Sequence, residues 1–107
     1  MPAIHLIKRN TAEPRLVKVA DDPLTYTSGY WSLTEARAKS LVGGRIYLHE
    51  RQQEPSYFGG TITDAQPIRG GEHAGRVEFT FQPDAAGKNF RTPAEGWSQE
   101  SKITREG

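Results

Sequence analysis

The sequence predicts one small α+β domain: a curved, partly closed β-barrel of about five strands with one short capped helix. Three observations predict this fold. Several short segments are rich in apolar and aromatic residues, and two of them alternate apolar with polar residues. One segment begins with helix-capping residues, and a glycine pair interrupts one strand pattern. A chain of 107 residues is close to the commonest domain size.

Two strands are expected near the N-terminus. Residues 3–8 and residues 15–20 have the apolar, β-branched composition of short strands, and residues 12–14, which end in a proline, supply the turn between them. The second strand is expected to end at residues 21–23 (Asp-Asp-Pro), because proline cannot donate to a strand ladder and restricts the residue before it.

The strongest local pattern is the capping box Ser-Leu-Thr-Glu at residues 32–35. In such a box the Ser32 hydroxyl accepts a hydrogen bond from the Glu35 amide, and the Glu35 carboxylate reaches back to the first residue. A helix is therefore predicted over residues 33–42. Gly43 or Gly44 is expected to close it in the left-handed conformation.

Three more strand segments are expected in the second half of the domain. Residues 45–50 alternate apolar and polar side chains, and a polar loop follows. A strand over residues 57–63 contains Gly59-Gly60, which predicts a bulge or a sharp bend of the kind that curves a sheet toward a barrel. Residues 76–82 give the clearest alternating pattern, with valine and two phenylalanines on one face.

The domain organisation follows from a change in composition near residue 83. Residues 1–83 are expected to form the single compact domain. Residues 84–107 are expected to be a loosely ordered tail that lies across the domain through Phe90, Trp97 and Ile103.

The charge and composition exclude several classes of protein. With 14 basic and 13 acidic residues, the net charge of +1 suits neither a strongly basic DNA binder nor an acidic mimic of DNA. The absence of cysteine excludes disulfide scaffolds, thiolate zinc sites and cysteine nucleophiles, and it favours a reducing, cytoplasmic location. The sequence shows no secretory signal and no apolar segment that would span a bilayer, so no membrane association is expected.

The histidines do not form a metal-binding pattern in the sequence. His5, His49 and His73 lack the spacing of a helical ligand pair, so no metal or cofactor is expected. His5 and His49 are expected on outer strand faces, and His73 in a loop.

One pattern of a nuclease superfamily is present. Pro83-Asp84 followed by Glu100-Ser101-Lys102 matches a motif in which two carboxylates hold Mg²⁺ beside a lysine. Such a short pattern arises easily by chance, and the residues before Glu100 do not read as a buried strand. The protein is therefore not expected to be an enzyme.

Aromatic and basic residues gather around the predicted helix and the strand after it. Aromatic rings and guanidinium groups are what base stacking and phosphate contacts require, so this region is the candidate nucleic-acid site. The alternative is structural: Trp31 serves as a hydrophobic staple before the helix, and Phe58 belongs to the core. The candidate nucleic-acid-binding residues are Tyr30, Trp31, Arg37, Arg45, Arg51, Ser56 and Tyr57.

The segment from residue 43 to residue 62 carries a family resemblance. Residues 43–49 (GGRIYLH), a polar loop with Pro55, and residues 58–62 (FGGTI) resemble the core of PUA-like domains, a superfamily that includes the EVE, ASCH and YTH groups. The resemblance covers about residues 29–63. It implies a pseudo-barrel that binds RNA or modified bases in DNA. The implied aromatic pocket consists of Tyr30, Trp31, Ser56 and Tyr57, and the implied phosphate contacts are Arg37, Arg45 and Arg51.

The expected function is therefore a non-catalytic nucleic-acid-binding module for RNA or modified bases, without a cofactor. The alternative is a small protein-interaction or regulatory accessory domain that uses the same surface for a protein partner. The sequence does not determine the oligomeric state.

Overall fold

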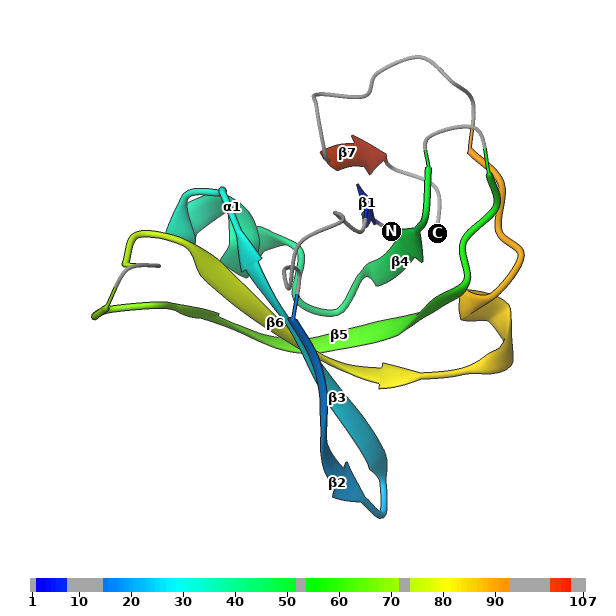
Figure 1. The fold of residues 1–107 in the computed structure, drawn as a ribbon, viewed down its shortest axis with the longest axis horizontal. Coiled ribbons are helices and arrows are strands. Elements are labelled where there is room, and N and C mark those ends of the chain that lie inside the picture. The colour runs from blue at the N-terminus through cyan, green and yellow to red at the C-terminus, as the bar shows by residue number, and fades with distance from the viewer. Residues whose placement is uncertain (1, 8–14, 52–53, 72–73, 93–100, 105–107) are drawn as a thin grey trace.

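The computed structural model describes residues 2–7, 15–51, 54–71, 74–92 and 101–104 (Figure 1). These residues form strands, one short α-helix and one 3₁₀ turn. In chain order the elements are β1 (Ala3–Ile7), β2 (Arg15–Asp21), β3 (Leu24–Trp31), α1 (Glu35–Ser40), β4 (Arg45–His49), β5 (Phe58–Pro67), β6 (Val77–Pro83), η1 (Ala85–Gly87) and β7 (Ser101–Thr104).

The strands make one seven-stranded mixed sheet in the order β2-β3-β6-β5-β4-β1-β7. β1 and β4 are parallel, and the other strand pairs are antiparallel. The α+β class is as predicted, but the sheet is open rather than closed. Closure requires the edge strands to meet, and here the β2–β3 hairpin projects away from the body while β7 lies at the other edge (Figure 1).

The hydrophobic core lies on one face of this sheet. The alternating residues Ile4 and Leu6 of β1 lie beside Ile46 and Leu48 of β4 in register, and all four are fully buried. The core continues through Ile62, Ala65, Val77, Phe79 and Phe81, and α1 packs on it through Ala38. Alternation along each strand therefore leaves the second face of β1 and β4 for other residues.

The helix is shorter than predicted, and its cap is a different residue. α1 spans Glu35–Ser40, and the Thr34 hydroxyl, not that of Ser32, accepts from the Arg37 amide at 3.2 Å. Ser32 lies two residues before this cap, outside the helix, so the predicted capping box is wrong. Gly43 adopts the predicted left-handed conformation with φ of 91°, and its amide donates to the Ile62 carbonyl at 2.8 Å.

The glycine pair in β5 permits close backbone approach rather than a bulge. The register of the β5–β6 pair shifts between Ile62 and Asp64, beyond the glycines. A Cβ atom at Gly59 would collide with the Ile46 carbonyl, and one at Gly60 would collide with the Gln82 carbonyl. Glycine is needed here because neighbouring backbones press on β5 from both sides.

The structure describes residues 84–92 and 101–104 of the C-terminal segment, in which Phe90 and Ile103 lie against the domain as predicted. Residues 84–92 include η1 and pack against the end of β4 and the loop that follows it, and β7 pairs with β1. Residues 93–100 and 105–107, including Trp97, lie outside the described residues. Within the described part of the chain, no helix has the length and apolar character needed to cross a membrane.

Candidate functional site

A buried polar layer covers the second face of β1, β4 and β7. It consists of His5, Arg45, Tyr47, His49 and Lys102, which alternate with the core residues of the same strands. The register places His5 beside Tyr47 on one side and Lys102 on the other. The predicted position of His5 and His49 on exposed outer faces is therefore wrong: both are fully buried. His73 lies outside the described residues.

The two imidazoles form a hydrogen-bonded pair. His5 Nδ1 lies 2.9 Å from His49 Nε2, and His49 Nδ1 lies 2.8 Å from the Glu54 carbonyl oxygen. A carbonyl only accepts, so His49 Nδ1 carries the proton; in neutral His49 the Nε2 atom then accepts from His5 Nδ1. Burial, with the nearby His49 and Lys102, lowers the pKa of His5 to about 3. Burial also lowers the pKa of His49. Both rings are therefore neutral near pH 7.

Three rings stack to bring the C-terminal segment onto this layer. The His5 and Tyr47 rings have centroids 4.9 Å apart at 18°, and the Tyr47 and Phe90 rings are 4.2 Å apart at 17°. Near-parallel contacts at these distances are favourable beyond the area they bury. Phe90 therefore anchors residues 84–92 on the layer.

Ser56 joins the same segment to the β4–β5 loop. Its hydroxyl donates to the Gly87 carbonyl at 2.7 Å and accepts from the Phe90 amide at 3.0 Å. Backbone hydrogen bonds run from Ser56 N to Phe90 O and from Asn89 N to Ser56 O. The sequence predicts Ser56 as a ligand contact, but in the structure its buried hydroxyl is engaged by Gly87 and Phe90 and ties the two segments together.

Arg45 forms a two-pronged ion pair with Asp84. Nη1 donates to Oδ2 at 2.6 Å and Nη2 to Oδ1 at 2.8 Å, and Nη1 also donates to the Thr61 hydroxyl at 3.1 Å. The hydrogen bond from Arg45 lowers the pKa of Asp84, and the same bond raises the pKa of Arg45. The predicted phosphate contact at Arg45 is therefore corrected to an internal pair. Asp84, the first carboxylate of the nuclease-like pattern, is occupied by the same pair.

The remaining predicted residues do not form one surface. Trp31 is buried in the core, and its Nε1 donates to the Ser28 hydroxyl at 3.2 Å, so its ring is not available to a base. Tyr30 lies in β3, but its side chain is outside what the structure describes. Arg37 is exposed on α1, and Arg51 is exposed in the β4–β5 loop. In Figure 1 these two elements lie on different sides of the strands.

Arg37 lines an open pocket of about 670 Å³ between α1 and β7. Its lining includes Leu41, Ile103 and Thr104. This pocket holds one of the seven predicted residues and no aromatic side chain, so it is not the predicted aromatic pocket.

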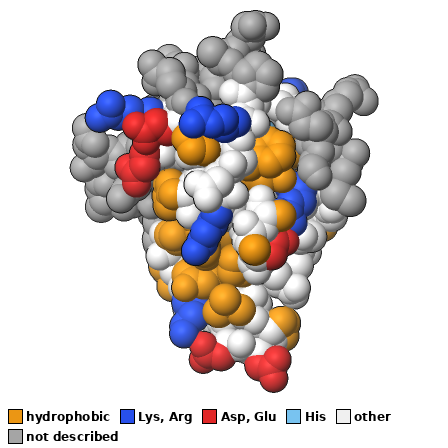
Figure 2. Space-filling view, turned by 90° about the vertical axis from the view of Figure 1, so that its right-hand side faces the viewer, with side chains coloured by type: hydrophobic (Ala, Val, Ile, Leu, Met, Phe, Trp, Pro, Cys, Tyr) orange, Lys and Arg blue, Asp and Glu red, His pale blue; other side chains and the backbone are white. Residues whose placement is uncertain are grey.

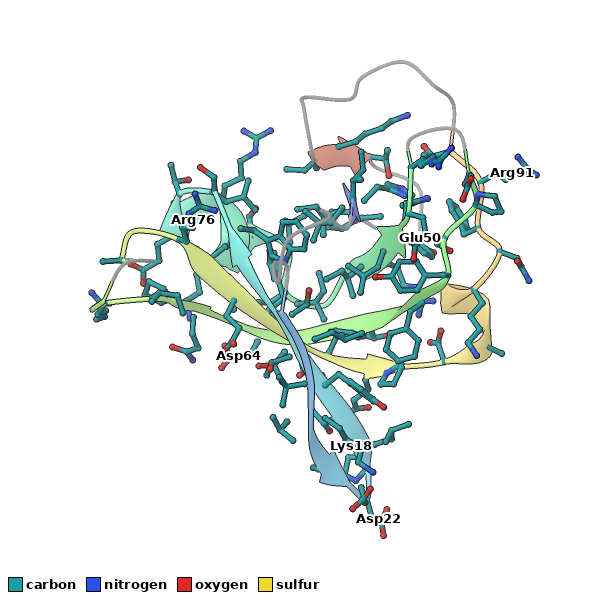
Figure 3. The ribbon with its side chains drawn as sticks, viewed as in Figure 1. Lys18, Asp22, Glu50, Asp64, Arg76 and Arg91 are labelled. Carbon is teal, nitrogen blue, oxygen red and sulfur yellow. The ribbon has the colours of Figure 1, made fainter. Side chains whose placement is uncertain are left out.

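The structure brings two other cations to the β4–β5 loop that carries Arg51. The ties of Ser56 place Lys88 and Arg91, which flank Asn89 and Phe90, next to the β4–β5 loop, and both are exposed. We call Arg51, Lys88 and Arg91 the cationic rim. Tyr57, half-buried, follows Ser56 directly. Figure 3 shows Arg91 and Glu50 at this same edge of the molecule.

The sequence contained a signal for this arrangement. The run Lys88-Asn89-Phe90-Arg91 places cations on either side of an aromatic ring, but it falls in the segment that was predicted to be a tail. Within the described ranges, no three His, Asp or Glu side chains are grouped as metal ligands.

Neither a protein-family model, nor a curated protein, nor a solved structure matches this chain. The fold and the site define an α+β domain with an open mixed sheet, a buried histidine pair and an exposed cationic rim.

Proposed function

We propose that this protein is a non-catalytic module that binds RNA or base-modified single-stranded DNA at the cationic rim. The observation that carries the proposal is the set of hydrogen bonds between Ser56 and residues 87–90. These bonds hold the segment that carries Lys88 and Arg91 against Ser56, in the loop that also carries Arg51 and leads to Tyr57. Cations beside an aromatic ring are the groups that single-stranded nucleic acid requires.

The charge balance of the rim favours weak, salt-sensitive binding. The three cations stand against the exposed carboxylates Glu50 and Glu54 in the same loop. A small number of phosphate contacts releases few counterions, so affinity falls moderately with salt concentration. Duplex DNA, which offers few accessible base faces, is expected to bind less well than single strands.

Tyr57 is the candidate stacking residue. Its ring is half-buried against the core, and burial, with the nearby Glu50, raises the pKa of the phenol to about 12. The ring is therefore neutral at physiological pH. A neutral ring with one exposed part suits base stacking, which contributes about 1–3 kcal/mol per base.

The resemblance to PUA-like domains supports the same proposal. It covers β4 and β5, and the loop between them carries Arg51 and leads to Tyr57. Members of that superfamily bind RNA or modified bases. Under this proposal the β4–β5 pair is the counterpart of the strand pair in the PUA-like pseudo-barrel.

The experiment is a set of binding titrations with fluorescently labelled RNA, single-stranded DNA with and without modified bases, and duplex DNA at low salt. Binding to single strands is expected to exceed binding to duplex. The substitution Tyr57→Leu is expected to weaken binding by about 1–3 kcal/mol, with little change in its salt dependence. If the folded protein binds none of these strands, the proposal is wrong, and the alternative of a protein-interaction domain takes its place.

A further inference from the structure

The β2–β3 hairpin exposes large apolar side chains. Leu16, Val19 and Leu24 are 38%, 55% and 42% exposed. In the rest of the described ranges, Val42 is the only other exposed large apolar residue, with 40% of its surface exposed. The hairpin projects from the body of the molecule, and β2 is an edge of the sheet (Figure 1).

The strand register places most of these residues on one face. Leu16 pairs with Ser28, Lys18 with Tyr26, and Asp21 with Leu24, so these side chains share a side of the ribbon. We call Leu16, Lys18, Asp21, Leu24 and Tyr26 the hairpin face.

This face continues the hydrophobic core outward. The Tyr26 ring lies edge-on to Phe58, with centroids 5.1 Å apart, and 6.3 Å from Phe81. α1 packs on β5 and β6 and follows the end of β3 that lies opposite the hairpin turn (Figure 1). Figure 2 shows hydrophobic side chains gathered toward the lower end of the molecule, where the hairpin lies, with acidic side chains at its tip. A contiguous exposed apolar patch rimmed by charge is typical of a protein interface.

The charges on the hairpin face indicate which protein fits. Lys18 Nζ lies 2.7 Å from Asp21 Oδ1, and both side chains are largely exposed. A cation and an anion side by side form a self-complementary pattern: an inverted copy places Lys18 over Asp21 of the other chain and Asp21 over Lys18. An unrelated partner would have to supply both charges in the reverse order.

We propose that the hairpin face binds a second copy of this protein about a two-fold axis, apolar face against apolar face. Two-fold dimers with self-complementary patches are the commonest oligomers. Pairing of the two β2 edges is not the contact we infer. The register of β2 shifts between Lys18 and Ala20, and bulges and charged side chains are features that protect an edge strand from pairing.

The test is sedimentation velocity of the full chain over a range from micromolar to near-millimolar concentration. Wild type is expected to show a growing dimer fraction. Leu16→Asp and Leu24→Asp should each raise the dissociation constant at least about tenfold, because each buries a new charge in the contact. Val42→Asp is the matched control, since Val42 is equally exposed but outside the hairpin, and it should leave the dimer unchanged.

A charge exchange separates a second copy from any other contact. Lys18→Glu alone makes the charged positions of the face wholly acidic and should weaken the dimer. The double change Lys18→Glu with Asp21→Lys restores a self-complementary pattern and should restore the dimer, with melting curves confirming that each variant is folded. Wild type that remains monomeric at every concentration overturns the proposal. A dimer that Val42→Asp weakens as much as Leu24→Asp overturns it as well.

Discussion

His5 Nδ1 lies 2.9 Å from His49 Nε2, on parallel strands whose register offsets the two residues by one position on the same face. Both rings are fully buried, and the stack of Tyr47 and Phe90 lies beside them. A proton added to either ring would put a charge close to buried Lys102. The fold therefore favours the neutral form of both rings.

This relationship predicts loss of stability in mild acid. The pKa of His5 is depressed from 6.5 to about 3, so between these values the unfolded chain binds the proton and the folded chain does not. Stability is therefore fully present above about pH 6.5 and falls as the pH decreases below it. At pH 5 the free energy of unfolding should be lower than at pH 7 by about 1–2 kcal/mol from His5. Urea unfolding at the two pH values measures this change.

The variant His5→Gln isolates the histidine contribution. The informative quantity is the free energy of unfolding of wild type minus that of the variant, measured at each pH. This difference should decrease from pH 7 to pH 5, since only wild type loses the contribution of His5. An unchanged difference at both pH values would show that His5 is not protonated preferentially in the unfolded chain.

The ion pair of Arg45 and Asp84 predicts a second effect on stability. Asp84→Asn leaves the nearly buried guanidinium without its carboxylate and should cost about 2–3 kcal/mol. The pKa of Asp84 is lowered, so its contribution is present above the usual carboxyl range and is lost only as the pH falls through the depressed value. The loss from Asp84 therefore begins only below the ordinary carboxyl pKa of 3.8, whereas the loss from His5 begins near pH 6.5.

The matched control for this prediction is Asp64→Asn. Asp64 Oδ1 lies 3.7 Å from Lys39 Nζ, and both side chains are about half exposed. Loss of an exposed pair of this kind costs about 0–1 kcal/mol. Chemical unfolding at pH 7 compares the two variants, and equal losses would mean that the Arg45 pair contributes no more than a surface contact.

The alternation of apolar and polar residues predicted some strands of the domain and missed others. Residues 45–50 and 76–82 were predicted as strands and are β4 and β6 within one residue at either end. β3 was missed because Ser28-Gly29 interrupts its alternation after four residues, and β7 because four residues give too short a pattern. β7 forms because β1 offers it a free edge, which is information that no local pattern holds.

The candidate site was predicted only in part, for a similar reason. Arg51 and Tyr57 remain at the proposed interface, whereas Trp31, Arg45 and Ser56 are used inside the fold. Composition shows which residue types are near one another in the chain. It does not show that Asp84 contacts Arg45 or that Phe90 contacts Ser56. Those contacts join residues more than thirty positions apart.

The helix cap gives a direct test of the corrected boundary. Thr34→Ala removes the side-chain acceptor of the Arg37 amide and should cost about 1 kcal/mol. Ser32→Ala should change the free energy of unfolding by less than about 0.5 kcal/mol, because Ser32 is exposed and lies outside the helix. Thermal or urea unfolding of both variants distinguishes the two caps. If Ser32→Ala lowered the free energy of unfolding more than Thr34→Ala does, Ser32 would be the cap and the corrected boundary would be wrong.

The salt dependence of single-strand binding tests the proposed function most directly. The variants are the triple change Arg51→Ala, Lys88→Ala and Arg91→Ala, and the control Arg76→Ala, an exposed arginine at the opposite side of the molecule (Figure 3). Each phosphate contact contributes about 0.7 to the slope of log affinity against log salt for single strands, so the triple variant should lose about 2 units of slope. Arg76→Ala should keep the wild-type slope and affinity. Equal slopes for wild type and the triple variant, or an equal loss in Arg76→Ala, would contradict binding at the cationic rim.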